Sequence, residues 1–180
     1  MGLSLKHYVY EVNNLVNLHM QFSENSRVWV YQADRELSPT EVEQIQEQLN
    51  AFTFSWTAHN NQLKAKAEVR YNRFLILIVD ESQAGASGCS IDKSVHFMQH
   101  LEQEFNISLF DRFNLAYREG GQILSAPRHA FEDLIKQNSI NKQTIVFNNM
   151  VQNLAQLETQ WEVPFKDSWH NRLFNDLVNN

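Results

Sequence analysis

The stretch RFLILIVD at 73–80 constrains the fold of this chain more than any other. Every position from Phe74 to Val79 is apolar, which is typical of a strand buried on both faces. Successive side chains of a strand point to opposite faces of the sheet, so both faces need a cover. We therefore expect the second face to be covered by C-terminal helices, with or without residues 3–20; a homodimer partner is the alternative cover.

The elements around this strand follow the order β-α-β-β-α-β, which is the ferredoxin-like pattern. Ser38 and Glu41 have the spacing of a capping box, and YN at 71–72 is a turn signal between two strands. The core strands are predicted at 27–32, 63–70, 73–80 and 113–118, and the core helices at 39–54 and 90–105. Further elements are predicted as a helix from Pro127, a strand at 144–147, a helix at 149–161 and a helix capped by Ser168. The sequence thus predicts an α+β protein with a ferredoxin-like β-α-β-β-α-β core and additional C-terminal helices covering the sheet.

Length and composition limit the class of protein further. The chain has 180 residues, and we expect a helical extension at residues 1–19 and a single α+β domain at residues 20–180. No apolar run approaches the ~20 residues that cross a bilayer, and the N-terminus lacks a secretion-signal pattern, so we expect a cytoplasmic protein with no membrane partner. The formal net charge of −6 argues against nucleic acid as a partner.

Three stretches of the chain are distinctive: SRVWVYQADREL, VDESQAGASGCSIDKSV and WEVPFKDSWHNRLF. Together they resemble a family of small uncharacterised proteins from Bacteroidetes that often carry the label ABC transporter ATPase. The resemblance spans residues 26–174 and implies no catalytic residues, while its members begin near the position of Met20. A P-loop requires G-x-x-x-x-G-K-[ST], whereas residues 85–90 read GASGCS without a lysine, so the ATPase label is rejected.

The loop DESQAGASGCSID at 80–92 is the predicted functional site, because it joins the buried strand to a helix and contains the only cysteine. In the predicted topology this loop lies beside the loop 56–62 and beside the ends of the first and fourth strands. The residues expected to meet there are Arg27, His59, Asp80, Cys89, Asp92 and Arg118.

Cys89 suggests one kind of chemistry for this site. A helix N-terminus can activate the thiol, with His59 as its base and Asp80 orienting the histidine. Three nearby carboxylates disfavour a thiolate, and small buried cysteines are common in protein cores. We therefore expect Cys89 to be buried and slow to react, with the cysteine-dependent enzyme as the alternative.

The small residues of the loop suggest a second kind of chemistry. Main-chain N–H groups at Ser87, Gly88 and Ser90 can cradle an anion, helped by Arg27 or Arg118. The simpler interpretation is that a serine caps the following helix, while Gly85 and Gly88 relieve backbone crowding.

Metal binding is the weakest of the interpretations. The carboxylates Asp80, Glu81 and Asp92 lack the spacing of an EF-hand, and HFMQH at 96–100 lacks the glutamate of a zinc-protease motif. We therefore expect no metal and no cofactor, and an exposed pair at His96 and His100. The prediction for function is a non-catalytic module that binds a protein partner or a small anionic ligand.

Overall fold

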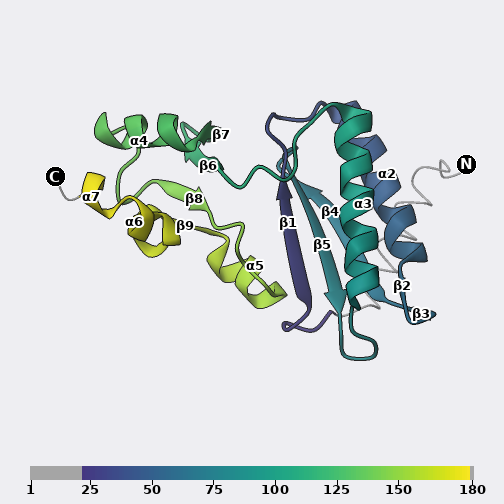
Figure 1. Cartoon of the computed structure of the whole chain (residues 1–180). Helices are drawn as coiled ribbons and strands as arrows, with labels where there is room; N and C mark the ends of the chain where they lie inside the picture. The colour runs from purple at the N-terminus through teal and green to yellow at the C-terminus, as the bar shows by residue number, and fades with distance from the viewer. Residues whose placement is uncertain (1–21, 179–180) are drawn as a thin grey trace, which may run out of the picture.

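The computed structural model describes residues 22–178 of the chain. The helix expected at residues 3–20 and the extension expected at residues 1–19 therefore lie outside the described residues. The described chain forms two lobes that lie side by side (Figure 1), which we call the first lobe (residues 27–105) and the second lobe (residues 114–178). The linker at residues 106–113 joins them.

The first lobe is a three-stranded antiparallel sheet with two helices on one face (Figure 1). In sheet order, its strands are β1 (Arg27–Gln32), β5 (Phe74–Asp80) and β4 (Lys64–Arg70). Its helices are α2 (Pro39–Ser55) and α3 (Gly88–Phe105). Two short strands, β2 (Thr57–Ala58) and β3 (Asn61–Gln62), form a small hairpin after α2.

Local sequence signals account for these elements. The Ser38 side chain accepts a hydrogen bond from the N–H of Glu41 and the Glu41 carboxylate accepts one from the N–H of Ser38, so the predicted capping box is confirmed. Tyr71 and Asn72 have φ angles of 55° and 51°, as the tight turn between β4 and β5 requires. The predicted strands and helices of this lobe are confirmed within a few residues.

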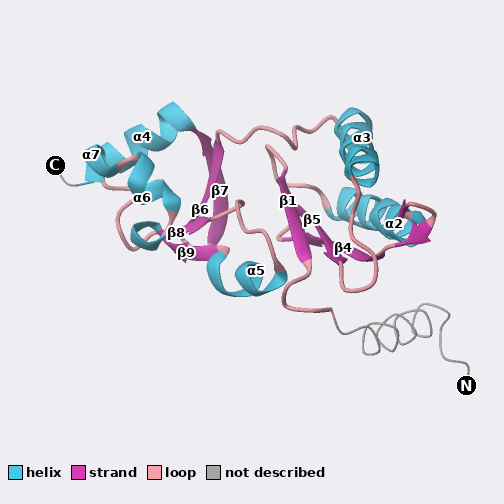
Figure 2. Cartoon of the chain, turned by 60° about the horizontal axis from the view of Figure 1, so that its bottom comes forward, coloured by secondary structure: helices cyan, strands magenta, loops and turns pink. Residues whose placement is uncertain are grey.

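The second lobe contains a four-stranded antiparallel sheet, with one helix toward the first lobe and the others on the side away from it (Figure 2). In sheet order, its strands are β7 (Gln122–Pro127), β6 (Asn114–Glu119), β8 (Ile145–Phe147) and β9 (Glu162–Pro164). Its helical elements are α4 (Arg128–Lys136), α5 (Leu154–Gln160), the 3-10 turn η1 (Phe165–Asp167), α6 (Trp169–Leu173) and α7 (Asn175–Val178). Gly120 and Gly121, with φ angles of 55° and 84°, form the turn between β6 and β7, because both positions need the left-handed region that glycine adopts readily.

The strand β5 is the centre of the core, and each of its side chains from Phe74 to Val79 is 0% exposed. Its two faces contact different elements. Leu75, Leu77 and Val79 pack against α2 and α3, whereas Phe74, Ile76 and Ile78 pack against the second lobe. The expectation that both faces are covered is confirmed, but the cover is not helical alone: Ala116 of β6 and Phe147 of β8 contribute to it together with α5.

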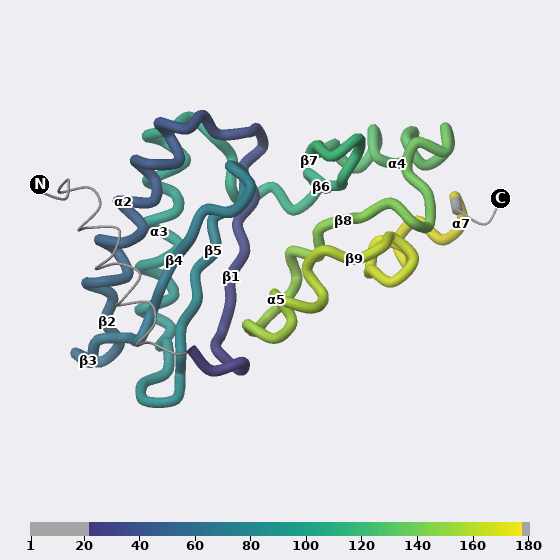
Figure 3. Tube along the Cα trace, turned by 180° about the vertical axis from the view of Figure 1, so that it is seen from behind, coloured from purple at the N-terminus to yellow at the C-terminus, as the bar shows by residue number. Residues whose placement is uncertain are grey.

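The α+β class is confirmed, but the four-stranded core sheet is wrong for the described chain. The predicted fourth strand forms as β6, yet β6 pairs with β7 and β8 in the second sheet. The linker carries the chain away from β1 before β6 begins. As a result β1 is an edge strand of the first sheet, and it is the strand nearest to the second lobe (Figures 1 and 3).

Candidate functional site

The loop at 80–92 lies at one end of the first sheet, where β5 ends and α3 begins. The Ser87 hydroxyl accepts a hydrogen bond from the N–H of Ser90 at 3.3 Å, and the Ser90 hydroxyl donates to the carbonyl of Ser87 at 2.8 Å. The interpretation that a serine caps the helix is therefore confirmed. A Cβ at Gly88 would meet no atom within 4 Å, and one at Gly85 would meet only a glutamate oxygen at 3.7 Å. The expectation that these glycines relieve crowding is wrong.

Cys89 has an exposed side chain, so the expectation of a buried core cysteine is wrong. The cause is the phase of α3, which buries Ser90, Ser94 and Met98 instead. His59 lies in the turn of the β2–β3 hairpin at φ 49°, and β2 contacts α3, so both residues lie at the same end of the lobe. Within residues 22–178 no hydrogen bond joins Cys89 to His59.

Asp80 is a buried carboxylate with structural partners. It accepts hydrogen bonds from the Nζ of Lys64 at 2.8 Å and from the N–H groups of Ser82 and Ser23 at 3.1 and 3.3 Å. The Lys64 hydrogen bond, helped by the two N–H donors, holds the pKa of Asp80 well below its usual range. This carboxylate therefore joins β4, the start of the loop and the segment before β1 at the end of the first sheet. No hydrogen bond in the described residues links it to His59.

The two arginines proposed for the loop lie at opposite ends of the sheet. The guanidinium of Arg27 is 3.9 Å from the carboxylate of Glu81 and 4.7 Å above the ring of Trp29. Arg118 instead pairs with Glu162 at 2.7 Å and lies 4.8 Å above the ring of Tyr71. Tyr71 precedes β5, whereas the loop follows it. The placement of Arg118 beside the loop is wrong, because β6 belongs to the second sheet.

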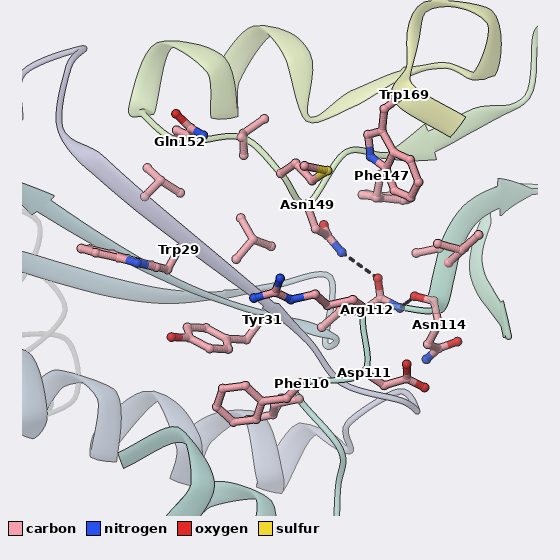
Figure 4. A pocket seen from close by; sticks show the side chains of 18 of the residues that line it. Trp29, Tyr31, Phe110, Asp111, Arg112, Asn114, Phe147, Asn149, Gln152 and Trp169 are labelled. Atoms are coloured by element: carbon pink, nitrogen blue, oxygen red, sulfur yellow. Dashed lines mark hydrogen bonds between the residues drawn. The ribbon is translucent and has the colours of Figure 1, made fainter. Parts of the chain in front are cut away.

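A groove of about 1120 Å³ runs along β1 between the two lobes (Figure 4). Its floor is formed by β1 from Arg27 to Gln32. One wall is formed by α3 and the linker, and the other by residues 147–153 and α6. Tyr31 on the floor contacts Phe110 of the linker edge to face, with ring centroids 5.4 Å apart.

Most of the exposed large apolar side chains of residues 22–178 line the groove. Six large apolar side chains are strongly exposed in the described chain, and four of them line the groove: Phe110, Phe113, Met150 and Leu173. Phe113 and Met150 are 64% and 67% exposed. Apolar side chains scattered singly over a surface are ordinary, whereas a cluster of them in a concave region marks an interaction site.

Arg112 provides an unpaired positive charge in this groove. Its guanidinium extends from the linker into the groove (Figure 4), and no ion pair or hydrogen bond to it exists within residues 22–178. The other two arginines of the lining have carboxylate partners, since Arg27 pairs with Glu81 and Arg128 pairs with Glu132. A bound acidic group would therefore find its partner at Arg112.

The α6 end of the groove contains buried nitrogens without partners. The Nε1 of Trp169 and the Nε2 of His170 have no hydrogen bond within the described residues, although Nδ1 of His170 lies 2.7 Å from the Ser168 hydroxyl. Burial lowers the pKa of His170 to about 4, so this side chain is neutral at pH 7. Unpaired buried polar atoms cost free energy, which a bound polar group would recover.

No motif or spacing in the sequence predicts this groove. Its lining comes from a linker and a loop, where side chains follow no periodic pattern. The one available signal was FDRFN at 110–114, which has two phenylalanines within a turn-rich segment. Ile91 and Val95 have the spacing of the buried stripe of α3, yet they are only half-buried and line the groove.

No family model, curated protein or solved structure matches this chain. Within residues 22–178, no helix has the length and apolar character needed to cross a membrane. The same residues contain no cluster of three His, Cys, Asp or Glu side chains suited to a metal ion. The predicted exposed pair at His96 and His100 is confirmed.

Proposed function

We propose that this protein is a non-catalytic interaction module whose groove along β1 binds an apolar segment of a partner protein. The observation that carries the proposal is the gathering of Phe110, Phe113, Met150 and Leu173 in one concave region. Elsewhere in the described chain, only Phe54 and Tyr71 expose large apolar side chains to a comparable degree.

The size of the groove favours a polypeptide over a small molecule. Its volume of about 1120 Å³ exceeds the roughly 300–1,000 Å³ of typical small-ligand pockets. Apolar walls with one unpaired arginine suit a segment that carries apolar side chains and an acidic group. The loop at 80–92 supports anion binding less well, because the N–H of Ser90, one of its three expected donors, already donates to the Ser87 hydroxyl in the helix cap.

We also propose that the first lobe is a ferredoxin-like unit whose fourth-strand position is open. The order β1-β5-β4, with α2 and α3 on one face, is that of the first three strands of this pattern. The fourth strand of such a sheet would pair with the outer edge of β1, where the groove lies.

The alternative function is a cysteine-dependent enzyme that uses Cys89 and His59. The exposed thiol and the shared position of the two residues at one end of the first lobe support it. The rate at which Cys89 is alkylated, with and without His59, separates it from the interaction module.

A peptide selection tests the proposed function. The full-length protein is panned against a phage-displayed library of random peptides of about 12 residues, long enough to exceed β1 at roughly 3.3 Å per residue. The affinity of the best peptides is then measured by fluorescence polarisation for the wild type, Phe113→Ser and Met150→Ser. We expect each substitution to weaken binding about tenfold, because each removes a large apolar contact.

Phe54→Ser is the matched control, since Phe54 is 80% exposed on α2 and does not line the groove. This variant should bind the peptides as the wild type does. Failure to select any peptide would overturn the proposal. So would binding that is lost in Phe54→Ser and unaffected by both groove substitutions.

A further inference from the structure

We propose that the bound segment extends the first sheet, pairing as a new strand with the outer edge of β1 while an acidic side chain of the segment binds Arg112. This inference rests on the proposed function, and it specifies how the groove recognises its partner. In this mode main-chain hydrogen bonds provide affinity, and the side chains on alternate faces provide selectivity.

The outer edge of β1 has unpaired main-chain groups. The N–H of Val28 donates to the carbonyl of Gln152, away from β5, whereas the N–H of Ala33 donates to Arg73 on the β5 side. Successive residues of a strand direct their N–H and carbonyl groups to opposite edges. The main-chain groups of Val30 and Gln32 therefore point to the outer edge of β1, as those of Val28 do. Within residues 22–178 no partner meets the carbonyl of Val28, either main-chain group of Val30 or the N–H of Gln32.

The chain itself already pairs with the first part of this edge. An isolated antiparallel bridge joins Arg27 to Asn153, and the N–H of Leu154 donates to the carbonyl of Ser26 at 2.9 Å. On the N-terminal side of Gln152 the chain turns away from β1 toward β8. The rest of the β1 edge is therefore open to the groove. The free groups of Val28, Val30 and Gln32 therefore continue a line of strand pairing that the fold has begun.

Exposed edges in monomeric proteins are usually protected by lysine, proline or a bulge, because they invite pairing with other chains. The open part of β1 reads WVYQ and has none of these devices. It lies instead at the floor of the groove, between the half-buried side chains of Ile91 and Val95 on one side and Met150 on the other. A strand in this position would place alternate side chains against the two walls.

The charge of the groove indicates the chemistry of the partner. Arg112 reaches into the groove without a carboxylate partner in the described chain, although the whole chain has a net charge of −6. A guanidinium forms two parallel hydrogen bonds with a carboxylate. We therefore commit to an extended protein segment that has apolar side chains at alternate positions and one aspartate or glutamate.

The first arm of the test probes the main chain of the bound segment. The strongest library peptide is synthesised with a single N-methyl group at each position in turn, and the affinity for the full-length protein is measured. A strand that pairs along one edge uses the N–H of every second residue, so we expect about a tenfold loss at alternate positions and little change between them. Tolerance at every position, or losses spaced by three or four residues, would overturn strand pairing.

The second arm probes the acidic contact. Arg112→Gln should lower the affinity for an acidic peptide about tenfold. The two proteins should bind equally well when the aspartate or glutamate of the peptide is replaced by asparagine or glutamine. Arg128→Gln is the matched control, because Arg128 lines the same groove but pairs with Glu132. Equal effects of the two protein variants would overturn the assignment of Arg112.

These outcomes separate the inference from the function on which it rests. If peptide binding depends on Phe113 and Met150 but tolerates N-methylation at every position, the groove is the binding site and strand pairing with β1 is refuted. Absence of any peptide binding would refute both. Light scattering tests the competing occupant, since a stable dimer that is disrupted by Val30→Pro would assign the edge to a second copy of the chain.

Discussion

The side-chain oxygen of Gln32 accepts a hydrogen bond from the amide of Asn149 at 2.8 Å, across the boundary between the two lobes. The side-chain nitrogen of Gln32 donates to the main-chain carbonyl of Asn114 at 2.9 Å. Gln32 is 6% exposed at the end of β1, and both partners belong to the second lobe. A single buried amide thus couples the lobes beside the groove.

Replacement of this amide should destabilise the protein. Gln32→Met keeps the length of the side chain but removes the acceptor of the Asn149 Nδ2 and the donor to the Asn114 carbonyl. We expect the free energy of unfolding in urea to fall by roughly 1–3 kcal/mol. Gln99→Met, at an exposed position of α3, should be neutral, and a Gln32 variant as stable as the wild type would contradict the coupling.

The local elements could be predicted from the sequence because each has its own signal. The capping box at Ser38, the Tyr71-Asn72 turn and the Gly120-Gly121 turn depend on neighbouring residues alone. The sheet to which β6 belongs could not be predicted, because NLAYRE has the pattern of a strand in either sheet. Strand pairing is decided by packing between distant parts of the chain.

The candidate site was predicted less well than the fold for a related reason. The small residues and the cysteine of the loop at 80–92 are local features, and they predict a site at that loop. The groove depends on Arg112 and Met150, which come from two different connections and meet only after the two lobes pack together. No spacing along the chain encodes that meeting.

The buried histidine should make stability depend on pH. His170 has a pKa of about 4 in the folded chain and an ordinary value of 6.5. Between these two pH values the unfolded chain binds more protons than the folded chain. The contribution of neutral His170 to the free energy of unfolding is therefore fully present above pH 6.5 and decreases as the pH drops toward 4. We expect a loss of about 2 kcal/mol in the free energy of unfolding between pH 7.5 and pH 5.

Two variants check this assignment by urea unfolding at several pH values. His170→Asn retains an acceptor near the Ser168 hydroxyl but does not titrate, so its stability should change much less over this range. His129→Asn, at an exposed position, should keep the full loss. Asp80 is lost as a stabilising charge only below its ordinary value of 3.8, so it does not affect this window. Equal pH dependence in all three proteins would contradict the role of His170.

The thiol of Cys89 should react as an ordinary exposed cysteine. Its side chain is exposed, and no hydrogen bond in the described chain connects it to His59. We expect iodoacetamide to modify the folded protein at a rate close to that of the urea-unfolded chain, with no change in His59→Ala. A much faster rate that falls in His59→Ala would support the cysteine-dependent enzyme.

Hydrogen exchange at β1 tests the central claim most directly. In the free protein, the amides of Val30 and Gln32 should exchange much faster than those of Trp29 and Tyr31, which point toward β5. A saturating library-selected peptide should slow exchange at Val30 and Gln32 and leave Trp29 and Tyr31 unchanged. Exchange at Val30 and Gln32 that is already slow in the free protein, or that the bound peptide leaves unchanged, would contradict strand addition at this edge.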